Sequence, residues 1–144
     1  MPRRTVTDMT NISLQYAPVT VDDVDAAVPF YRDALGLEVL QDVDYGGHRW
    51  VTLGFADGGG VAIVLSDPGA GRSPDDGDAL HSLVAKGVGP GPFVFSTDDL
   101  DAAFERVREW GAEVLQEPMQ QDWGPRDCAF RDPAGNHIRL NQAA

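Results

Sequence analysis

Hydrophobic residues recur with two different spacings along the chain, and the two spacings alternate in the same order twice. Apolar residues three and four positions apart predict helices, and strict alternation predicts strands, because successive strand side chains point to opposite faces. The helical spacing occurs at Val24, Ala27, Val28, Tyr31 and Leu35, and again at Leu100, Phe104 and Val107. The strand spacing occurs in segments 12–19, 38–43, 49–55, 61–65, 93–95, 113–117, 126–130 and 137–140. Each half of the chain is therefore predicted to be βαβββ.

The two halves also repeat in sequence. Residues 22–27 return as residues 98–103 at an offset of 76, and residues 36–41 return as residues 111–116 at an offset of 75. One residue is therefore missing from the second copy between these two stretches. Two further matches, at an offset of 77, are Arg49 with Arg126 and Gly58 with Gly135. The chain is thus a duplicated module of about half its length.

Turn and capping residues set the expected boundaries. Thr20 or Asp22 can cap the first helix and Thr97 or Asp98 the second, because a short side-chain oxygen accepts a free backbone N–H. Pro29 predicts a kink in the first helix or a later start for it. The expected organisation is a flexible tail (1–10), a first module (11–66), a connector (67–91) and a second module (92–144). The connector is rich in Gly, Pro and Asp, and a short helix is expected in it at 78–85.

Composition narrows the function classes. The chain has 144 residues, of which 42% are hydrophobic, and no apolar run approaches the length of about 18 that a membrane span needs. The single cysteine, Cys128, excludes a disulfide within the chain, so a cytoplasmic location is expected. The net charge of −12 disfavours nucleic-acid and membrane partners. The acidity either favours a cationic ligand or only keeps the protein in solution.

Three stretches of the sequence resemble the vicinal oxygen chelate superfamily, which includes glyoxalase I, extradiol dioxygenases, fosfomycin-resistance proteins and bleomycin-binding proteins. They are residues 21–24, residues 30–38 and the stretch Phe-Arg-Asp-Pro-Ala-Gly-Asn at 130–136. The resemblance implies an α+β fold in which two tandem βαβββ modules form curved mixed sheets around a cavity, within a homodimer. Whether the modules pair within one chain or swap between subunits is left open.

The resemblance also implies four metal-ligand positions, which members of this superfamily fill with His, Gln or Glu. In this chain they fall at Tyr16, Ala62, Pro92 and Arg139. None of these side chains suits a divalent metal ion, so no metal and no other cofactor is expected. A bulge at Pro18 would instead turn Gln15 inward. The three histidines, His48, His81 and His137, share no ligand spacing and are expected at the surface.

Strand alternation divides the remaining strand residues between two faces. The face beneath the helices is expected to hold Val51, Leu53, Phe55, Ile63, Leu65, Cys128, Phe130, Ile138 and Leu140. The candidate ligand-binding residues on the opposite face and beside it are Tyr16, Trp50, Thr52, Ser96, Trp123, Asp127, Arg139 and Asn141. Asp127 and Arg139 form either a buried ion pair or a ligand anchor. Trp50 is either a stacking platform or core, and Trp123 is either a lid or part of a dimer interface.

Three functions remain in competition. The first is a metal-independent protein that binds a small organic ligand, cationic or aromatic, in the cavity of a homodimer. The second is a metal-dependent lyase or dioxygenase of the superfamily with shifted ligands. The third is a metal-free enzyme in which Asp127 acts as general base and Arg139 polarises the substrate, which is chemically unfavourable because a nearby arginine lowers the pKa of an aspartate.

Overall fold

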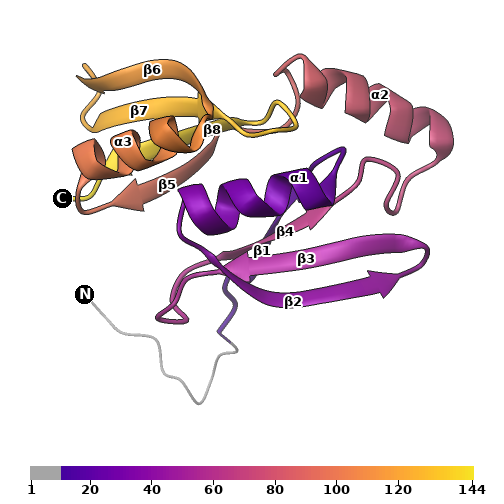
Figure 1. Ribbon diagram of the computed structural model, residues 1–144. Helices are drawn as coiled ribbons and strands as arrows, with labels where there is room; N and C mark the ends of the chain where they lie inside the picture. Colours follow the sequence, from indigo (N-terminus) through magenta and orange to yellow (C-terminus); the bar gives the residue numbers. More distant parts are fainter. Residues whose placement is uncertain (1–10) are drawn as a thin grey trace.

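The computed structural model describes residues 11–144, so the flexible tail expected at 1–10 lies outside the described residues. Its strands form two four-stranded sheets (Figure 1). Sheet A has the order β1-β4-β3-β2 and sheet B the order β5-β8-β7-β6. In both sheets the first strand runs parallel to the fourth, and the other pairs are antiparallel. The strands of sheet A are β1 (Tyr16–Thr20), β2 (Glu38–Tyr45), β3 (His48–Gly54) and β4 (Ala62–Ser66). Those of sheet B are β5 (Phe93–Thr97), β6 (Glu113–Gln120), β7 (Arg126–Arg131) and β8 (His137–Gln142).

One helix crosses each sheet, α1 (Val24–Pro29) over sheet A and α3 (Leu100–Trp110) over sheet B (Figure 1). The caps differ by one residue from those expected, because Asp23 and Asp99 accept the free N–H groups rather than Asp22 or Asp98. Equivalent ion pairs brace each helix to a strand, Arg49 with Asp25 and Arg126 with Asp101. The duplication read from the sequence is therefore repeated in the packing.

The first helix continues past Pro29 as a wide π turn, η2 (Phe30–Ala34), rather than kinking or starting late. Pro29 has no backbone N–H and cannot make the α-helical bond to the preceding turn. The Leu35 N–H then bonds to the Phe30 carbonyl five residues earlier, at 3.1 Å. A π turn takes up one residue more than an α turn. It therefore accounts for the one-residue difference between the two copies.

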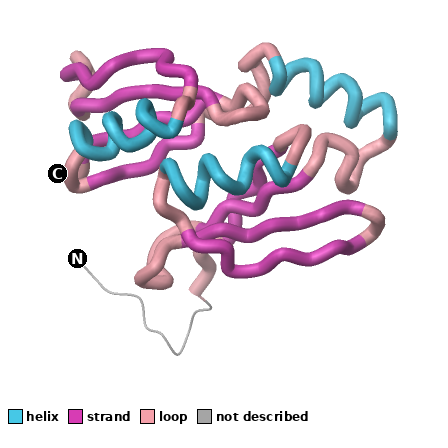
Figure 2. The backbone as a smooth tube through the Cα atoms, in the orientation of Figure 1, coloured by secondary structure: helices cyan, strands magenta, loops and turns pink. Residues whose placement is uncertain are grey.

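Several boundaries differ from the sequence expectation. The first strand begins at Tyr16 rather than at Ile12, because β4, its hydrogen-bonding neighbour, begins at Ala62 opposite Tyr16. The connector helix, α2 (Pro74–Ala85), starts four residues earlier than expected, with Ser73 as its cap. It lies to one side of both sheets (Figure 2). No helix of residues 11–144 is long and apolar enough to cross a membrane.

A single hydrophobic core joins the two modules. The expected inward-facing residues are buried, except that Phe55 lies beyond the end of β3 and is 37% exposed. Phe30 and Trp110 meet edge to face across the junction, with ring centroids 5.5 Å apart. The Arg106 guanidinium of α3 also donates to the Asp33 carbonyl of η2 at 2.9 Å.

Buried polar contacts join the modules as well. The Tyr31 hydroxyl donates to Asp132 Oδ2 at 2.6 Å, and Asn136 Nδ2 donates to the Thr20 carbonyl at 2.8 Å. Asp132 also accepts three backbone N–H groups of its own turn. The Asp-Pro-Ala-Gly-Asn turn therefore fastens the second module onto the first helix.

Candidate functional site

The eight candidate residues lie on two sheets. Sheet A carries Tyr16 on β1 and Trp50 and Thr52 on β3. Sheet B carries Ser96 on β5, Asp127 on β7, and Arg139 and Asn141 on β8, while Trp123 lies in the turn between β6 and β7. Except for Trp123, all alternate with residues that face the helices. We call the two surfaces that they define open face A and open face B.

Open face B is built around a closed cluster of polar side chains. Asn141 stands directly across from Asp127 and Ser96, on the two neighbouring strands. Arg139 Nε and Nη2 donate to Asp127 Oδ2 at 3.0 and 2.7 Å. Asp127 is 1% exposed. The pair expected from the sequence is therefore a nearly buried ion pair.

Two glutamines complete this cluster. Gln116 Nε2 and Gln121 Nε2 donate to Asp127 Oδ1 at 2.9 and 2.8 Å. Gln116 Oε1 in turn accepts from Arg139 Nη2 at 2.7 Å. Sequence reasoning missed both glutamines, since a register shift in β6 between Gln116 and Met119 interrupts the alternation there. The match of Gln116 to Gln41 in the repeat was the available signal.

The cluster controls the charge of open face B. Burial alone would raise the pKa of Asp127, but hydrogen bonds from Gln116, Gln121 and Arg139, together with the arginine charge, bring it below its ordinary value. Asp127 is therefore a carboxylate at neutral pH, and its charge offsets that of Arg139. Burial and the charges of Arg139 and Arg131 lower the pKa of His137.

The histidines occupy three different settings. His137, expected at the surface, is partly buried, with Nε2 3.3 Å from Arg139 Nη1. His48 is also partly buried and bonds to Asp67 at 2.7 Å. His81 is exposed on α2, and its nearest acidic partner is Asp22 at 3.6 Å. Among residues 11–144, no three His, Cys, Asp or Glu side chains gather where they could hold a metal ion.

Open face A is aromatic and carries little charge. Trp50 is partly buried, and its indole N–H donates to the Tyr45 carbonyl at 3.1 Å, so its ring face is the part left for contact. Val43 stands directly opposite Trp50 on β2, and Gln41 opposite Thr52. This face therefore favours stacking over ionic contacts.

The strand registers correct one of the four metal-ligand positions implied by the resemblance. Thr52 and Ala129 are equivalent at an offset of 77, and they pair with Val64 and Arg139. Val64, rather than Ala62, is thus the counterpart of Arg139, because the loop before β4 is two residues longer than its repeat. Val64 is as unsuited to a metal ion as Ala62.

The structure also tests the alternative ligand in the first strand. β1 pairs with β4 without a break from Tyr16 to Thr20, so Pro18 makes no bulge. Gln15 lies before β1, and its carbonyl accepts the Ala62 N–H. Gln15 is therefore not turned inward by a shift of this strand.

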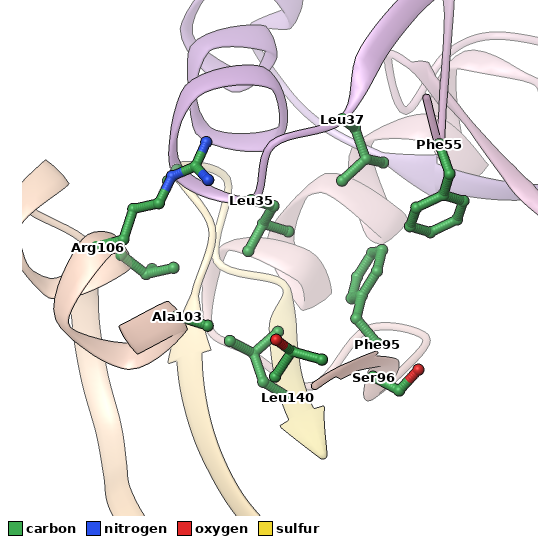
Figure 3. A pocket seen from close by; sticks show the side chains of 11 residues that line it. Leu35, Leu37, Phe55, Phe95, Ser96, Ala103, Arg106 and Leu140 are labelled. Atoms are coloured by element: carbon green, nitrogen blue, oxygen red, sulfur yellow. The ribbon is translucent and has the colours of Figure 1, made fainter. Parts of the chain in front are cut away.

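Two cavities lie between the modules, with volumes of about 220 and 540 Å³. Both are mostly apolar, and Phe55 and Phe95 point toward one another in the smaller one (Figure 3). Ser96 lines both cavities, whereas the other seven candidate residues line neither. The aliphatic part of Arg106 borders the smaller cavity, while its guanidinium is bonded to η2. The cavities are thus separate from the polar cluster.

Large apolar side chains remain uncovered on or beside the two open faces. Six of them are between 40% and 76% exposed, namely Tyr16, Val43, Tyr45, Val94, Met119 and Trp123. Exposed apolar side chains mark ligand-binding grooves or protein interfaces where they gather into a patch. The single chain thus presents two surfaces of complementary chemistry, one aromatic and one polar.

The duplicated βαβββ modules and their two mixed sheets define an α+β fold of the glyoxalase type. The sequence profile of the Glyoxalase/Bleomycin resistance protein/Dioxygenase superfamily matches residues 13–140. The chain belongs to this superfamily.

Three similar proteins illustrate the range of its relatives. The crystal structure of UcmS2 has a TM-score of 0.82 and 32% identity, covering 93% of this chain and 100% of that one. TnmS3, an antibiotic binding protein from Streptomyces sp. CB03234, has a TM-score of 0.72 and 29% identity, covering 94% and 99%. A probable lactoylglutathione lyase from Synechocystis is 26% identical over 134 residues, covering 91% and 95%.

Proposed function

We propose that this protein binds a small aromatic organic compound without a metal ion, and that the binding cleft is completed by a second copy of the chain. The observation that carries the proposal is Arg139. It occupies one of the four ligand positions that the family resemblance implies, and Asp127 holds its guanidinium in place. A guanidinium has only N–H donors and stays protonated, so Arg139 has no lone pair to offer a metal ion at this ligand position.

The other three positions support the same proposal. Tyr16 and Pro92 stand at two of them, and Val64 stands at the third. Only the phenol oxygen of Tyr16 could contact a metal ion, and one such ligand does not make a site. The residues present therefore do not fit the metal that the superfamily commonly uses.

The uncovered apolar side chains support the second copy. In a homodimer, open face A of one subunit would meet open face B of its partner, so that an aromatic wall faces a polar one. A ligand pocket of this kind is mostly apolar with a few placed polar groups. TnmS3, which is similar in fold and sequence, is an antibiotic binding protein.

A metal-free reaction with Asp127 as general base finds less support. Asp127 is 1% exposed, and both of its oxygens already accept hydrogen bonds. Its lowered pKa makes it a weak base at neutral pH.

The test separates this proposal from a metal-dependent lyase, the activity named for the Synechocystis relative. The purified protein is offered Ni²⁺, Zn²⁺ and Fe²⁺, its metal content is measured, and its melting temperature is compared with that of the untreated protein. We expect less than about a tenth of an equivalent of metal and no stabilisation. One equivalent of metal with a raised melting temperature would refute the proposal. Sedimentation velocity, with a dimer as the expected species, tests the second copy.

A further inference from the structure

Every acceptor position of the Asp127 carboxylate already receives a hydrogen bond. A carboxylate has about four acceptor positions. Oδ1 accepts from Gln116 and Gln121, and Oδ2 accepts twice from Arg139. Together with its burial, this leaves Asp127 no free lone pair and no open path to a positively charged ligand.

The groups left free on open face B are mainly donors. Arg139 has five N–H groups. Nε and Nη2 use three of them on Asp127 and Gln116, and Nη1 uses a fourth on His137. One N–H of Nη1 has no other bond among the described residues.

His137 orients the nitrogen that carries this free N–H. Its Nε2 faces an Arg139 nitrogen that can only donate, so Nε2 accepts and the proton lies on Nδ1. The lowered pKa of His137 is consistent with this neutral ring. Because His137 and Arg139 are two apart on β8, both lie on open face B.

Net charge disfavours an anionic ligand as well. Asp127 offsets the charge of Arg139, and the chain as a whole carries −12. Open face A adds an aromatic wall, at the edge of which His48 bonds to Asp67 at 2.7 Å. The two faces together thus offer stacking and the free N–H of Arg139 as a hydrogen-bond donor.

We infer that the ligand of this cleft is a neutral planar compound that presents a carbonyl oxygen to the free N–H of Arg139, whose Nη1 is oriented by His137 Nε2. This inference rests on the proposed binding function and replaces the cationic ligand that the acidic composition suggested. Asp127 positions Arg139 and does not contact the ligand.

A matched pair of tricyclic compounds tests the ligand class. Acridone is neutral and carries a carbonyl oxygen, whereas 9-aminoacridine has the same outline and is a cation at pH 7. Binding of each compound is measured by equilibrium dialysis at about 0.15 M salt, which screens the nonspecific electrostatic attraction between the acidic chain and cations. We expect acridone to bind at least about tenfold more tightly, because only acridone carries an oxygen that can accept from the free N–H of Arg139.

Two histidine variants localise the effect. His137→Phe keeps a planar side chain but removes the nitrogen that orients Arg139 Nη1, and it should weaken acridone binding roughly three- to tenfold. His81→Phe changes a histidine on α2, away from both faces, and should leave binding unchanged. Binding of acridone by the His137→Phe variant equal to that of the parent would overturn the inference.

The remaining outcomes separate the two proposals. Tighter binding of 9-aminoacridine than of acridone would contradict the ligand class and leave the binding function standing. Retention of neither compound by the dimeric protein would contradict the proposed function and the inference together.

Discussion

The Tyr31 hydroxyl offers a direct test of how the two modules are held together. It is fully buried and donates to Asp132 Oδ2 at 2.6 Å, across 101 residues of sequence. Tyr31→Phe removes this oxygen and keeps the ring, including its edge-to-face contact with Phe30 at 4.9 Å between centroids. The variant therefore isolates one hydrogen bond between the modules.

The size of the effect follows from what Asp132 keeps. A hydrogen bond to a charged group contributes about 1.5–3 kcal/mol. Asp132 Oδ2 still accepts from Asn136 Nδ2 at 2.9 Å, and Oδ1 still accepts three backbone N–H groups. Because the carboxylate is not left without donors, we expect a loss of about 2 kcal/mol at pH 7.

The pH dependence gives the prediction a second signature. Burial, then the charge of Asp132 and the hydrogen bond to it, raise the pKa of Tyr31 well above its ordinary value of 10.0. Above pH 10 the unfolded chain therefore loses a proton that the folded chain keeps, and stability falls as pH rises. The fall is at most about 1.4 kcal/mol per pH unit. Phe has no such proton, so the deficit of the variant should shrink above pH 10.

Urea unfolding at a fixed protein concentration, from pH 7 to pH 11, measures both signatures. Tyr45→Phe is the matched control, because Tyr45 is 76% exposed, and it should change stability by less than about 0.5 kcal/mol. A Tyr31→Phe deficit below about 0.5 kcal/mol at pH 7, or one that stays constant to pH 11, would refute the reasoning.

Three further substitutions or reactions follow from the structure. Asp127→Ala leaves a nearly buried guanidinium without its carboxylate and should lower the free energy of unfolding by about 3–5 kcal/mol, measured in urea. Because the pKa of Asp127 is lowered, the difference between parent and variant should shrink as pH falls below about 4. Burial raises the pKa of Cys128 to about 12, so a thiol reagent at pH 8 should label it only after unfolding, and rapid labelling of the native protein would contradict its burial. Gly135→Ala places a Cβ 2.4 Å from the Val84 carbonyl oxygen at a φ of +110°. It should therefore lower the free energy of unfolding more than Gly46→Ala, whose Cβ meets no atom within 4 Å and which should cost about 1 kcal/mol. Equal losses in urea unfolding would show that the turn at Gly135 adjusts to the added carbon.

The duplication made most of the fold predictable. Two copies of the same alternation gave all eight strands and the helix of each module, because a pattern present twice rarely arises by chance. The errors came where neighbouring residues were chemically equivalent. Asp22 and Asp23 can both cap a helix, and only the backbone geometry selects Asp23. Ile12 and Leu14 alternate as a strand does, yet no neighbouring strand reaches them.

The candidate site was predictable only where strands are regular. Alternation placed Asp127 and Arg139 on one face of adjacent strands, and the structure brings them together. Gln121 lies in a turn, and its contact with Asp127 depends on how β6 ends. Nothing in the order of residues says whether the two open faces meet within a chain or between chains, because that depends on tertiary packing.

The π turn at Phe30–Ala34 bears on how this chain tolerates changes in length. Removing a residue from an α-helix normally rotates everything beyond it by about 100° and turns its buried face toward solvent. Here the π turn already contains one extra residue between the Asp23 cap and Gly36. The second copy spans the same distance, from the Asp99 cap to Gly111, with one residue fewer. Deleting Arg32, which is exposed, would convert the wide turn to an α turn and leave both ends in register. The first helix is thus a place where the chain carries one residue more than its repeat, and where a deletion would restore the geometry of that repeat.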